Sequence, residues 1–280
     1  MNRIENQKLS GERALYDIHD AEVVGCYFFD GESPLKECSN LKVNNCTFDW
    51  KYPIWYGHHV DITDSVITSN GRAGIWYMDD CKFINDKIDA PKCFRRCKNL
   101  EVTNTEITDA KETFWYCDGV KLKDIKATGD YLCLNSKNVV IDNLYLDGNY
   151  GFDTCENIEM RNSTVIGRDV FWNCKNITVY DSKIIGKYLA WNSENVTFVN
   201  CHIESLQGLC YIKNVKLVNC TIADTELAFE FAENLDAEVN STIDSVTNIT
   251  SGRLICNGIG ELNMDEKYVD PSKTIIVIRK

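Results

Sequence analysis

Tryptophan side chains recur in this chain at near multiples of 19 residues, and they are the residues best suited to ligand chemistry. Five of its six tryptophans directly follow an apolar residue, in short segments where inward and outward positions alternate. They are Trp55, Trp76, Trp115, Trp172 and Trp191. A row of indoles offers flat apolar surfaces on which the C–H faces of sugar rings can stack. If the segments stack on one another, these side chains form one outward stripe, which predicts binding of a saccharide-like small molecule.

Charged residues occupy the same position of the segments. Arg95 and Glu230 interrupt the stripe and would contact the same ligand, and Asp153 also falls in it. Asp169 lies in the next segment, about three residues before the stripe, so the two aspartates could converge to the separation used by inverting glycoside hydrolases. With Asp130 as a third acid nearby, this arrangement predicts a carbohydrate hydrolase or lyase; for each acid alone, a solvated aspartate at a turn is the simpler interpretation.

The stripe also has two other interpretations. Neighbouring loops or a partner chain could cover the indoles, in which case the protein is a non-catalytic scaffold or a homo-oligomer that uses the stripe as its interface. An enzyme acting on another kind of substrate would instead have a closed pocket near the three aspartates. The basic run Lys92, Arg95, Arg96 and Lys98 could hold the carboxylate of a uronic acid, although such a run is more often a solvated edge.

An internal repeat of roughly 19 residues places these side chains. Segments with the pattern apolar, any, apolar, any, Asn or Asp begin at Ala21, Leu41, Val60, Cys81, Leu100, Val120, Val139, Ile158, Ile177, Val196, Val215 and Leu235. Alternation of period two predicts a strand with one buried face. A second apolar position and a third alternating stretch, with Phe94 and Phe114 inward, complete each unit. We therefore predict an all-β fold, a single-stranded right-handed parallel β-helix of about twelve rungs with three strands per rung.

The repeat predicts one domain over residues 1–280. Residues 1–20 would form an N-terminal cap, residues 21–253 the rungs, and residues 254–280 a C-terminal rung and cap, because open solenoid ends expose unpaired strand edges. A leucine-rich repeat is the main alternative, since it also uses about 20 residues and one Asn per unit. Its Asn falls three places after the second leucine of the strand, whereas here it falls two places after, and the rest of each unit alternates like a strand.

Two sets of small polar residues mark the corners of the repeat. Asparagines occur just before the first strand and again after it, and asparagine tolerates the left-handed conformation of a sharp bend. We expect these amides to bond one another from rung to rung. Cys38, Cys97, Cys117, Cys155 and Cys174 fall at one repeat position, which predicts a buried stack of free thiols.

Composition limits the class of protein. The net charge of −12 disfavours nucleic acid as a partner. Residues 1–15 lack the apolar core of a signal peptide and no run of 18 apolar residues occurs, so we expect a cytoplasmic protein without a membrane segment. The fourteen cysteines include no Cys-x-x-Cys pair, and the adjacent His58 and His59 would point to opposite sides of a strand. We expect no metal and no cofactor.

Several strings resemble an uncharacterised bacterial family, domain of unknown function three-seven-three-seven. They are Gly31–Glu37, Lys51–Tyr56, Arg72–Tyr77, Phe94–Cys97, Leu146–Tyr150, Phe171–Cys174 and Glu204–Gly208. The resemblance covers nearly the whole chain and implies a pectin-lyase-like β-helix, but it brings no established activity or catalytic residues. Some relatives are labelled hydrogenase; the chain has neither a metal-cluster cysteine motif nor a Rossmann glycine pattern, so we expect that it is not a hydrogenase.

Overall fold

The structure is a computed structural model that describes residues 2–279. The chain divides into two compact units, residues 1–140 and 141–280. Both are built of short parallel strands stacked rung on rung, and the helical elements of the described range are two 3-10 turns, Ser69–Gly71 (η1) and Pro271–Lys273 (η2). No helix within that range is both long and apolar enough to span a membrane.

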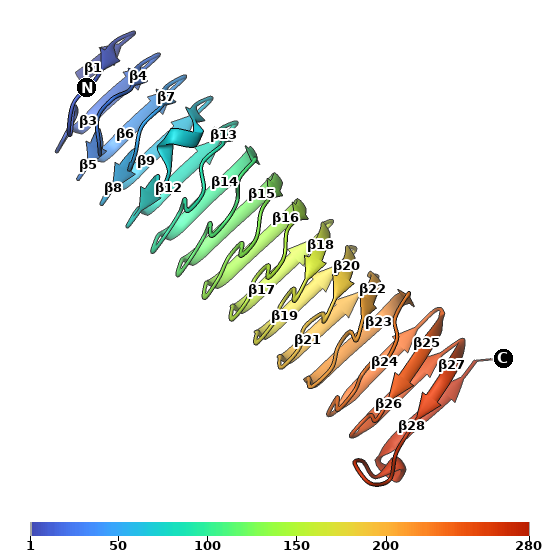
Figure 1. The fold of residues 1–280 in the computed structure, drawn as a ribbon. Helices are drawn as coiled ribbons and strands as arrows, with labels where there is room; N and C mark the ends of the chain where they lie inside the picture. Colours follow the sequence, from blue (N-terminus) through green and yellow to red (C-terminus); the bar gives the residue numbers. More distant parts are fainter. Residues whose placement is uncertain (1, 280) are drawn as a thin grey trace. The chain divides into compact units, whose positions relative to one another are not determined.

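The first unit contains the strands β1 to β15. They are β1 (Asn2–Glu5), β2 (Lys8–Leu9), β3 (His19–Val24), β4 (Tyr27–Phe28), β5 (Leu35–Lys36), β6 (Ser39–Asn44), β7 (Thr47–Phe48), β8 (Ile54–Trp55), β9 (His58–Thr63), β10 (Val66–Ile67), β11 (Ile75–Trp76), β12 (Asp79–Ile84), β13 (Lys87–Ile88), β14 (Lys98–Ile107) and β15 (Asp118–Thr128). The long strands β3, β6, β9, β12, β14 and β15 pair successively in parallel (Figure 1). Ala21 lies opposite Leu41, and Leu41 opposite Val60, so the predicted alignment of the segments is confirmed.

The second unit continues the same construction. Strand β16 (Lys137–Asp147) spans the division, and it is followed by β17 (Glu156–Arg161), β18 (Thr164–Arg168), β19 (Lys175–Tyr180), β20 (Lys183–Lys187), β21 (Glu194–Val199), β22 (His202–Leu206), β23 (Lys213–Ala223), β24 (Leu235–Val239), β25 (Thr242–Thr247), β26 (Gly252–Cys256), β27 (Gly258–Asn263) and β28 (Thr274–Ile278). Ile158, Ile177, Val196 and Val215 pair in sequence, again in the predicted register. The predicted class, a parallel β-solenoid, is therefore confirmed.

The solenoid has about fifteen rungs, where the repeat predicted about twelve. The additional rungs lie at the ends of the chain. Strand β1 pairs in parallel with β3, with Asn2 opposite Ala21, so residues 2–20 form a rung rather than the predicted cap. Strand β28 likewise pairs with β26. The N-terminal strand was missed because backbone pairing does not require the full apolar pattern by which the inner segments were recognised. A C-terminal rung was predicted within residues 254–280, and β28 lies in that range.

The third side of the rungs differs from the prediction of a third strand. In the first unit it is a two-residue strand in three rungs, β5, β8 and β11, and beyond them Arg95 makes only isolated bridges to Trp76 and Trp115. Phe94 and Phe114, expected within a strand, have φ values of 54° and 57°. Such positive φ values are incompatible with an extended strand, although both rings are fully buried as predicted.

The corner asparagines and the cysteine stack follow the prediction. Asn176, Asn195 and Asn214 have positive φ values, and the amide of each donates to the side-chain oxygen of the asparagine one rung earlier at 2.9 Å. The cysteines are all free and buried. Burial raises the pKa of Cys93 to about 12, so this thiol acts as a packing group rather than a nucleophile.

Candidate functional site

The tryptophan stripe of the first unit lies in one register. Trp55 pairs with Lys36 on one side and Trp76 on the other, and Arg95 bridges Trp76 and Trp115. All five side chains are half-buried. The prediction that residues about one repeat apart become neighbours is therefore confirmed for this unit.

Stacking within the stripe decides which surfaces a ligand can reach. The rings of Trp55 and Trp76 stack with centroids 5.0 Å apart and planes 5° apart. The Arg95 guanidinium lies 5.2 Å from the Trp76 ring and 4.3 Å from the Trp115 ring, so it is sandwiched between two indoles. The inner ring faces are thus covered by neighbours in the same row, and a ligand lying along the row meets ring edges instead of the predicted open faces.

The indole N–H groups are committed to the backbone. Nε1 of Trp55, Trp76 and Trp115 donates to the carbonyl oxygen of Ala73, Lys92 and Tyr131, at 2.8, 2.8 and 2.7 Å respectively. Each acceptor belongs to the turn of the following rung. These bonds hold the rings in a fixed orientation and stabilise the row from one rung to the next.

Arg95 is neutralised within the chain. Its Nη2 atom donates to Oε2 of Glu112 at 2.6 Å, and Lys92 lies 3.4 Å from the same oxygen. Burial of Glu112 opposes ionisation, but the bond from Arg95 and the charge of Lys92 outweigh it and lower the pKa of Glu112. Of the basic run, Arg96 rather than Arg95 is therefore the better group to meet an anionic ligand.

A row of tyrosines beside the indoles was not identified from the sequence. Tyr56 and Tyr77 stack at 4.6 Å with planes 2° apart, and Tyr56 and Tyr116 are 43% and 48% exposed. Lys36 lies 5.7 Å from the Tyr56 ring, and Arg96 lies 5.2 Å from the Tyr116 ring. The signal was a Trp-Tyr pair at three repeat positions. Strict alternation would turn the residue after tryptophan inward, but the positive φ of all three tyrosines keeps them at the surface.

The stripe of the second unit is less continuous. Backbone bonds from Thr154 to Trp172 and from Asn173 to Trp191 place Asp153, Trp172 and Trp191 in successive rungs. Glu230 is also half-buried on this side and accepts from the Tyr211 hydroxyl at 3.4 Å. The Trp172 Nε1 atom is buried without an acceptor among the residues of the described range.

Cys210 interrupts this stripe. It occupies the same repeat position as Trp172 and Trp191, but its side chain is fully buried and lies near carbonyl oxygens of Gly208 and Leu227. The repeat position therefore predicts the rung and the side of each residue, but not its exposure.

Asp153 and Asp169 lie in adjacent rungs and interact electrostatically. Burial is the main cause that raises the pKa of both carboxyls, and the charge of Asp153 raises the pKa of Asp169 further. Thr154 donates to Asp153 at 3.0 Å, and Arg168 lies 3.8 Å from Asp169; both oppose the increase. Two half-buried acids of this kind can divide the roles of proton donor and acceptor.

Asp130, the third predicted acid, lies in the other unit. Its backbone carbonyl accepts the N–H of Glu112, in the turn before the first unit's stripe. The structure thus groups Asp130 with Arg95 and Glu112, and it groups Asp153 with Asp169.

A stack of glycines precedes Asp169. Gly167 in β18 and Gly186 in β20 pair directly, and a Cβ atom on Gly186 would lie 1.8 Å from the carbonyl oxygen of Gly167. A Cβ atom on Gly167 would lie 2.0 Å from the carbonyl oxygen of Gly148. Only glycine allows the backbones to approach this closely as the chain turns towards Asp169.

We expect Gly186→Ala to destabilise the protein by about 3 kcal/mol, because the added methyl group collides with rigid backbone rather than with a movable side chain. Chemical denaturation monitored by circular dichroism measures the change. Gly151→Ala is the matched control, since its Cβ atom would approach only the tip of the Leu146 side chain, at 3.0 Å. Equal losses for the two variants would contradict this account of the glycine stack.

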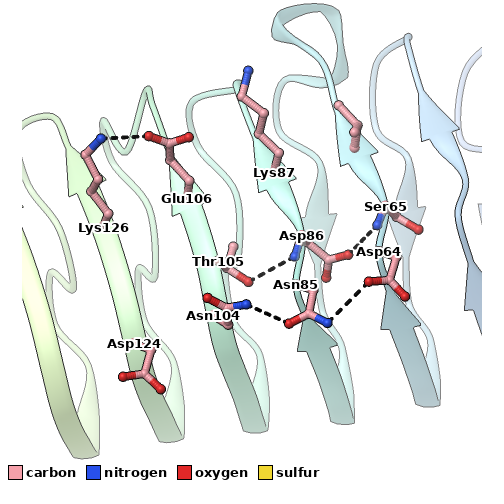
Figure 2. Close-up of a pocket in the computed structure, with 11 residues that line it drawn as sticks. Asp64, Ser65, Asn85, Asp86, Lys87, Asn104, Thr105, Glu106, Asp124 and Lys126 are labelled. Carbon is pink, nitrogen blue, oxygen red and sulfur yellow. Dashed lines mark hydrogen bonds and ion pairs between the residues drawn. The ribbon is translucent and has the colours of Figure 1, made fainter.

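A buried carboxylate at a corner of the first unit was also missed. Asp86 is 6% exposed and occupies the column in which the neighbouring rungs carry Ser65 and Thr105 (Figure 2). Its Oδ1 atom accepts the N–H of Ser65 at 2.8 Å, whereas its Oδ2 atom is buried without a partner. Burial is the main cause that raises the pKa of Asp86 to about 7, and the charge of Asp64 adds to the increase.

Asp86 borders an open depression of about 330 Å³. Figure 2 shows Asp64 and Asn104 on either side of Asn85, which is hydrogen-bonded to both. Within residues 2–279 no group of three or more His, Cys, Asp or Glu side chains could hold a metal ion, so we assign none to this depression.

The stacked parallel strands and the aromatic side of the rungs define a protein of the β-solenoid class. Within that class, the chain belongs to the family described as protein of unknown function (DUF3737), whose model matches residues 2–277. The resemblance noted in the sequence is thereby confirmed. No curated protein matches the chain.

Several solved structures are similar to the chain. The mannuronan C-5 epimerase AlgE4 A-module of Azotobacter vinelandii is 13% identical, over 85% of this chain and 78% of that chain, with a TM-score of 0.27. PfbA, a surface adhesin of Streptococcus pneumoniae, is 7% identical over 88% and 68% of the two chains, with a TM-score of 0.30. The catalytic domain of a GH87 alpha-1,3-glucanase is 8% identical over 100% and 62%, with a TM-score of 0.27. Similarities this low carry no argument about activity or substrate.

Proposed function

We propose that the protein binds a saccharide-like ligand along the aromatic side of the first unit. The observation that carries the proposal is the row of Tyr56, Tyr77 and Tyr116, in which Tyr56 and Tyr116 are exposed and Tyr77 is half-buried. The row runs beside the stacked indoles, with Lys36 and Arg96 over two of its rings. Sugars combine apolar C–H faces with many hydroxyl groups, so they suit a surface that alternates ring edges with hydrogen-bond donors.

The stacking within the row determines how such a ligand binds. Because the inner indole faces are covered, the exposed tyrosine rings and the edges of the tryptophans provide the apolar contact. The Arg96 guanidinium and the tyrosine hydroxyls then supply hydrogen bonds to sugar oxygens. The indoles hold the surface rigid, which reduces the entropy lost when the ligand binds.

A double variant, Tyr56→Ala with Tyr116→Ala, tests the proposal. Tryptophan fluorescence is titrated with neutral oligosaccharides and with oligosaccharides of uronic acids. We expect the wild type to respond to at least one series and the double variant to bind at least about tenfold more weakly, as when exposed aromatic anchors are removed from a binding surface. Arg96→Ala should weaken binding of the acidic series more than that of the neutral series.

Tyr145→Ala is the control, because Tyr145 is similarly exposed (41%) but lies in β16, outside the aromatic row. Absence of binding by the wild type at millimolar sugar, or equal weakening in this control, would exclude the proposed surface. Light scattering on the same samples examines the interpretation of the row as an interface: the Tyr56 and Tyr116 substitutions would then change the mass rather than ligand binding.

Hydrolase or lyase activity is a second candidate function, favoured by the paired carboxyls of Asp153 and Asp169. Hydrolysis of a glycosidic bond needs a protonated acid and an ionised base, and a raised pKa keeps one carboxyl protonated closer to neutral pH. We propose these two residues, without Asp130, as the acid–base pair of the second unit.

A further inference from the structure

Strand β28, Thr274–Ile278, is an open edge of the second unit. It pairs in parallel with β26 along one side, from Gly252 opposite Thr274 to Cys256 opposite Ile278. No strand in the described part of the chain pairs with its other side. The backbone N–H and C=O groups on that side are available to a further strand.

The side chains of this edge are apolar and exposed. Ile275, Val277 and Ile278 are 61%, 43% and 48% exposed, and the strand has no charged residue. Leu262 of β27, the strand that precedes β28 along the chain, is also exposed. A β-rich apolar segment with a free backbone edge is the type of surface that associates with another strand.

The edge strand of the first unit is different in character. Strand β1 carries Arg3 and Glu5, which pair with each other at 2.9 Å, and Arg3 also lies 3.7 Å from Glu22. Charges of this kind discourage strand addition. At the C-terminal edge, in contrast, β28 itself carries no charge, and Arg279 beside it forms an ion pair with Glu238 and a hydrogen bond with Asn240. The exposed Lys273 lies just before the strand.

We propose that β28 pairs in antiparallel orientation with β28 of a second copy of this chain. Two identical edges related by a two-fold axis match in hydrogen-bond pattern, and a register centred on Ile276 places Ile275 of one copy opposite Val277 of the other. Apolar side chains then face apolar side chains. Addition of β1 to β28 would instead set Arg3 and Glu5 beside isoleucine and valine and would generate an open filament.

The test measures the mass of the full chain over a range of concentrations by light scattering after size-exclusion chromatography. The wild type should reach twice the chain mass of 32.0 kDa. Ile275→Lys with Val277→Lys should dimerise at least about tenfold more weakly, and so remain at 32.0 kDa at concentrations where the wild type is a dimer. Both positions are exposed in the monomer, so the variant should keep the circular dichroism spectrum of the wild type. Val140→Lys with Tyr145→Lys is the control, because it replaces similarly exposed residues elsewhere and should still dimerise.

Hydrogen exchange provides a second measurement that does not depend on a variant. The amides of β28 should become more protected as the protein concentration rises, while those of β1 should not change. A wild type that stays at 32.0 kDa at the highest concentration would overturn the proposal. Dissociation of the control variant to the same extent as the double-lysine variant of β28 would also overturn it. Polymers of the wild type that disappear in Arg3→Ala would overturn it too, because they would indicate pairing of β1 with β28.

Discussion

Replacing Asp86 by serine is expected to stabilise the protein by up to about 4 kcal/mol at pH 8, while changing its stability little at pH 4. Burial raises the pKa of Asp86 from its ordinary value of 3.8 to about 7 in the folded chain. Because the folded state holds the proton more tightly than the unfolded chain, this residue favours folding most at low pH. Its contribution is lost as the pH rises from about 4 through 7.

Serine should fit the position because the column already uses it. Ser65 and Ser182 bond the carbonyl oxygen two residues earlier, at 2.8 and 2.6 Å, and the Ser182 hydroxyl also accepts the amide of Ser163. A serine at position 86 can make the same bonds and leaves no carboxylate oxygen buried without a partner.

Urea denaturation of the wild type and Asp86→Ser at several pH values from 4 to 8 measures the difference. Asp61→Ser removes an exposed carboxylate from the same unit and controls for the change in net charge. Other acids also titrate in this range, so the quantity to follow is the gap between variant and wild type. If the difference in free energy of unfolding between Asp86→Ser and the wild type does not increase from pH 4 to pH 8, then ionisation of Asp86 does not destabilise the folded chain, and the prediction is wrong.

Asp153→Asn and Asp169→Asn are each expected to lower any hydrolysis of a bound oligosaccharide by about 10²–10⁴-fold, the usual contribution of a general acid or base. Asparagine keeps the shape of aspartate but cannot transfer a proton. Binding should weaken far less than the rate, because asparagine keeps the polar contacts of the side chain and loses only the proton transfer. The rate should be greatest at a pH above the ordinary range of aspartate, since burial raises the pKa of both acids.

Thr154→Ala supplies a pH test of the same pair. The bond from the Thr154 hydroxyl lowers the pKa of Asp153, so its removal should move that pKa upwards, together with the limb of the pH profile that depends on it. Asp147→Asn, which removes an exposed carboxylate of the same unit, should leave the profile unchanged. If both aspartates titrate in the ordinary range when followed by NMR, the assignment of an acid–base pair is wrong.

The stacking of the rungs could be predicted because each segment repeats the same chemistry. Inward Val, Ile and Leu at alternate positions define the strand, and Asn at the corner defines where it bends, so the alignment of Leu41 with Val60 follows from spacing alone. The irregular third side could not be predicted in this way. Burial of Phe94 and Phe114 looks the same in a strand and in a chain with positive φ at alternate residues.

The candidate site was predicted in composition but not in detail. The rung spacing that makes Trp55 and Trp76 neighbours also brings their rings to stacking distance, and so covers the faces that a sugar would have used. The pairing of Arg95 with Glu112 depends on a turn one rung away, which the repeat does not specify. Asp86, by contrast, could have been found, because it is the one acid among neighbours at the same repeat position, Cys46, Ser65 and Thr105, that are small and uncharged.

Pairing between successive rungs makes the length of this protein adjustable in whole periods. Deletion of residues 177–195 would place Val196 where Ile177 now lies, opposite Ile158. It would remove one residue from each column of stacked side chains. The remaining residues of each column would still stack in register. Loss of a few residues within one rung would instead shift the register of part of that rung relative to its neighbours. Variation in length among relatives should therefore be quantised in steps of one period.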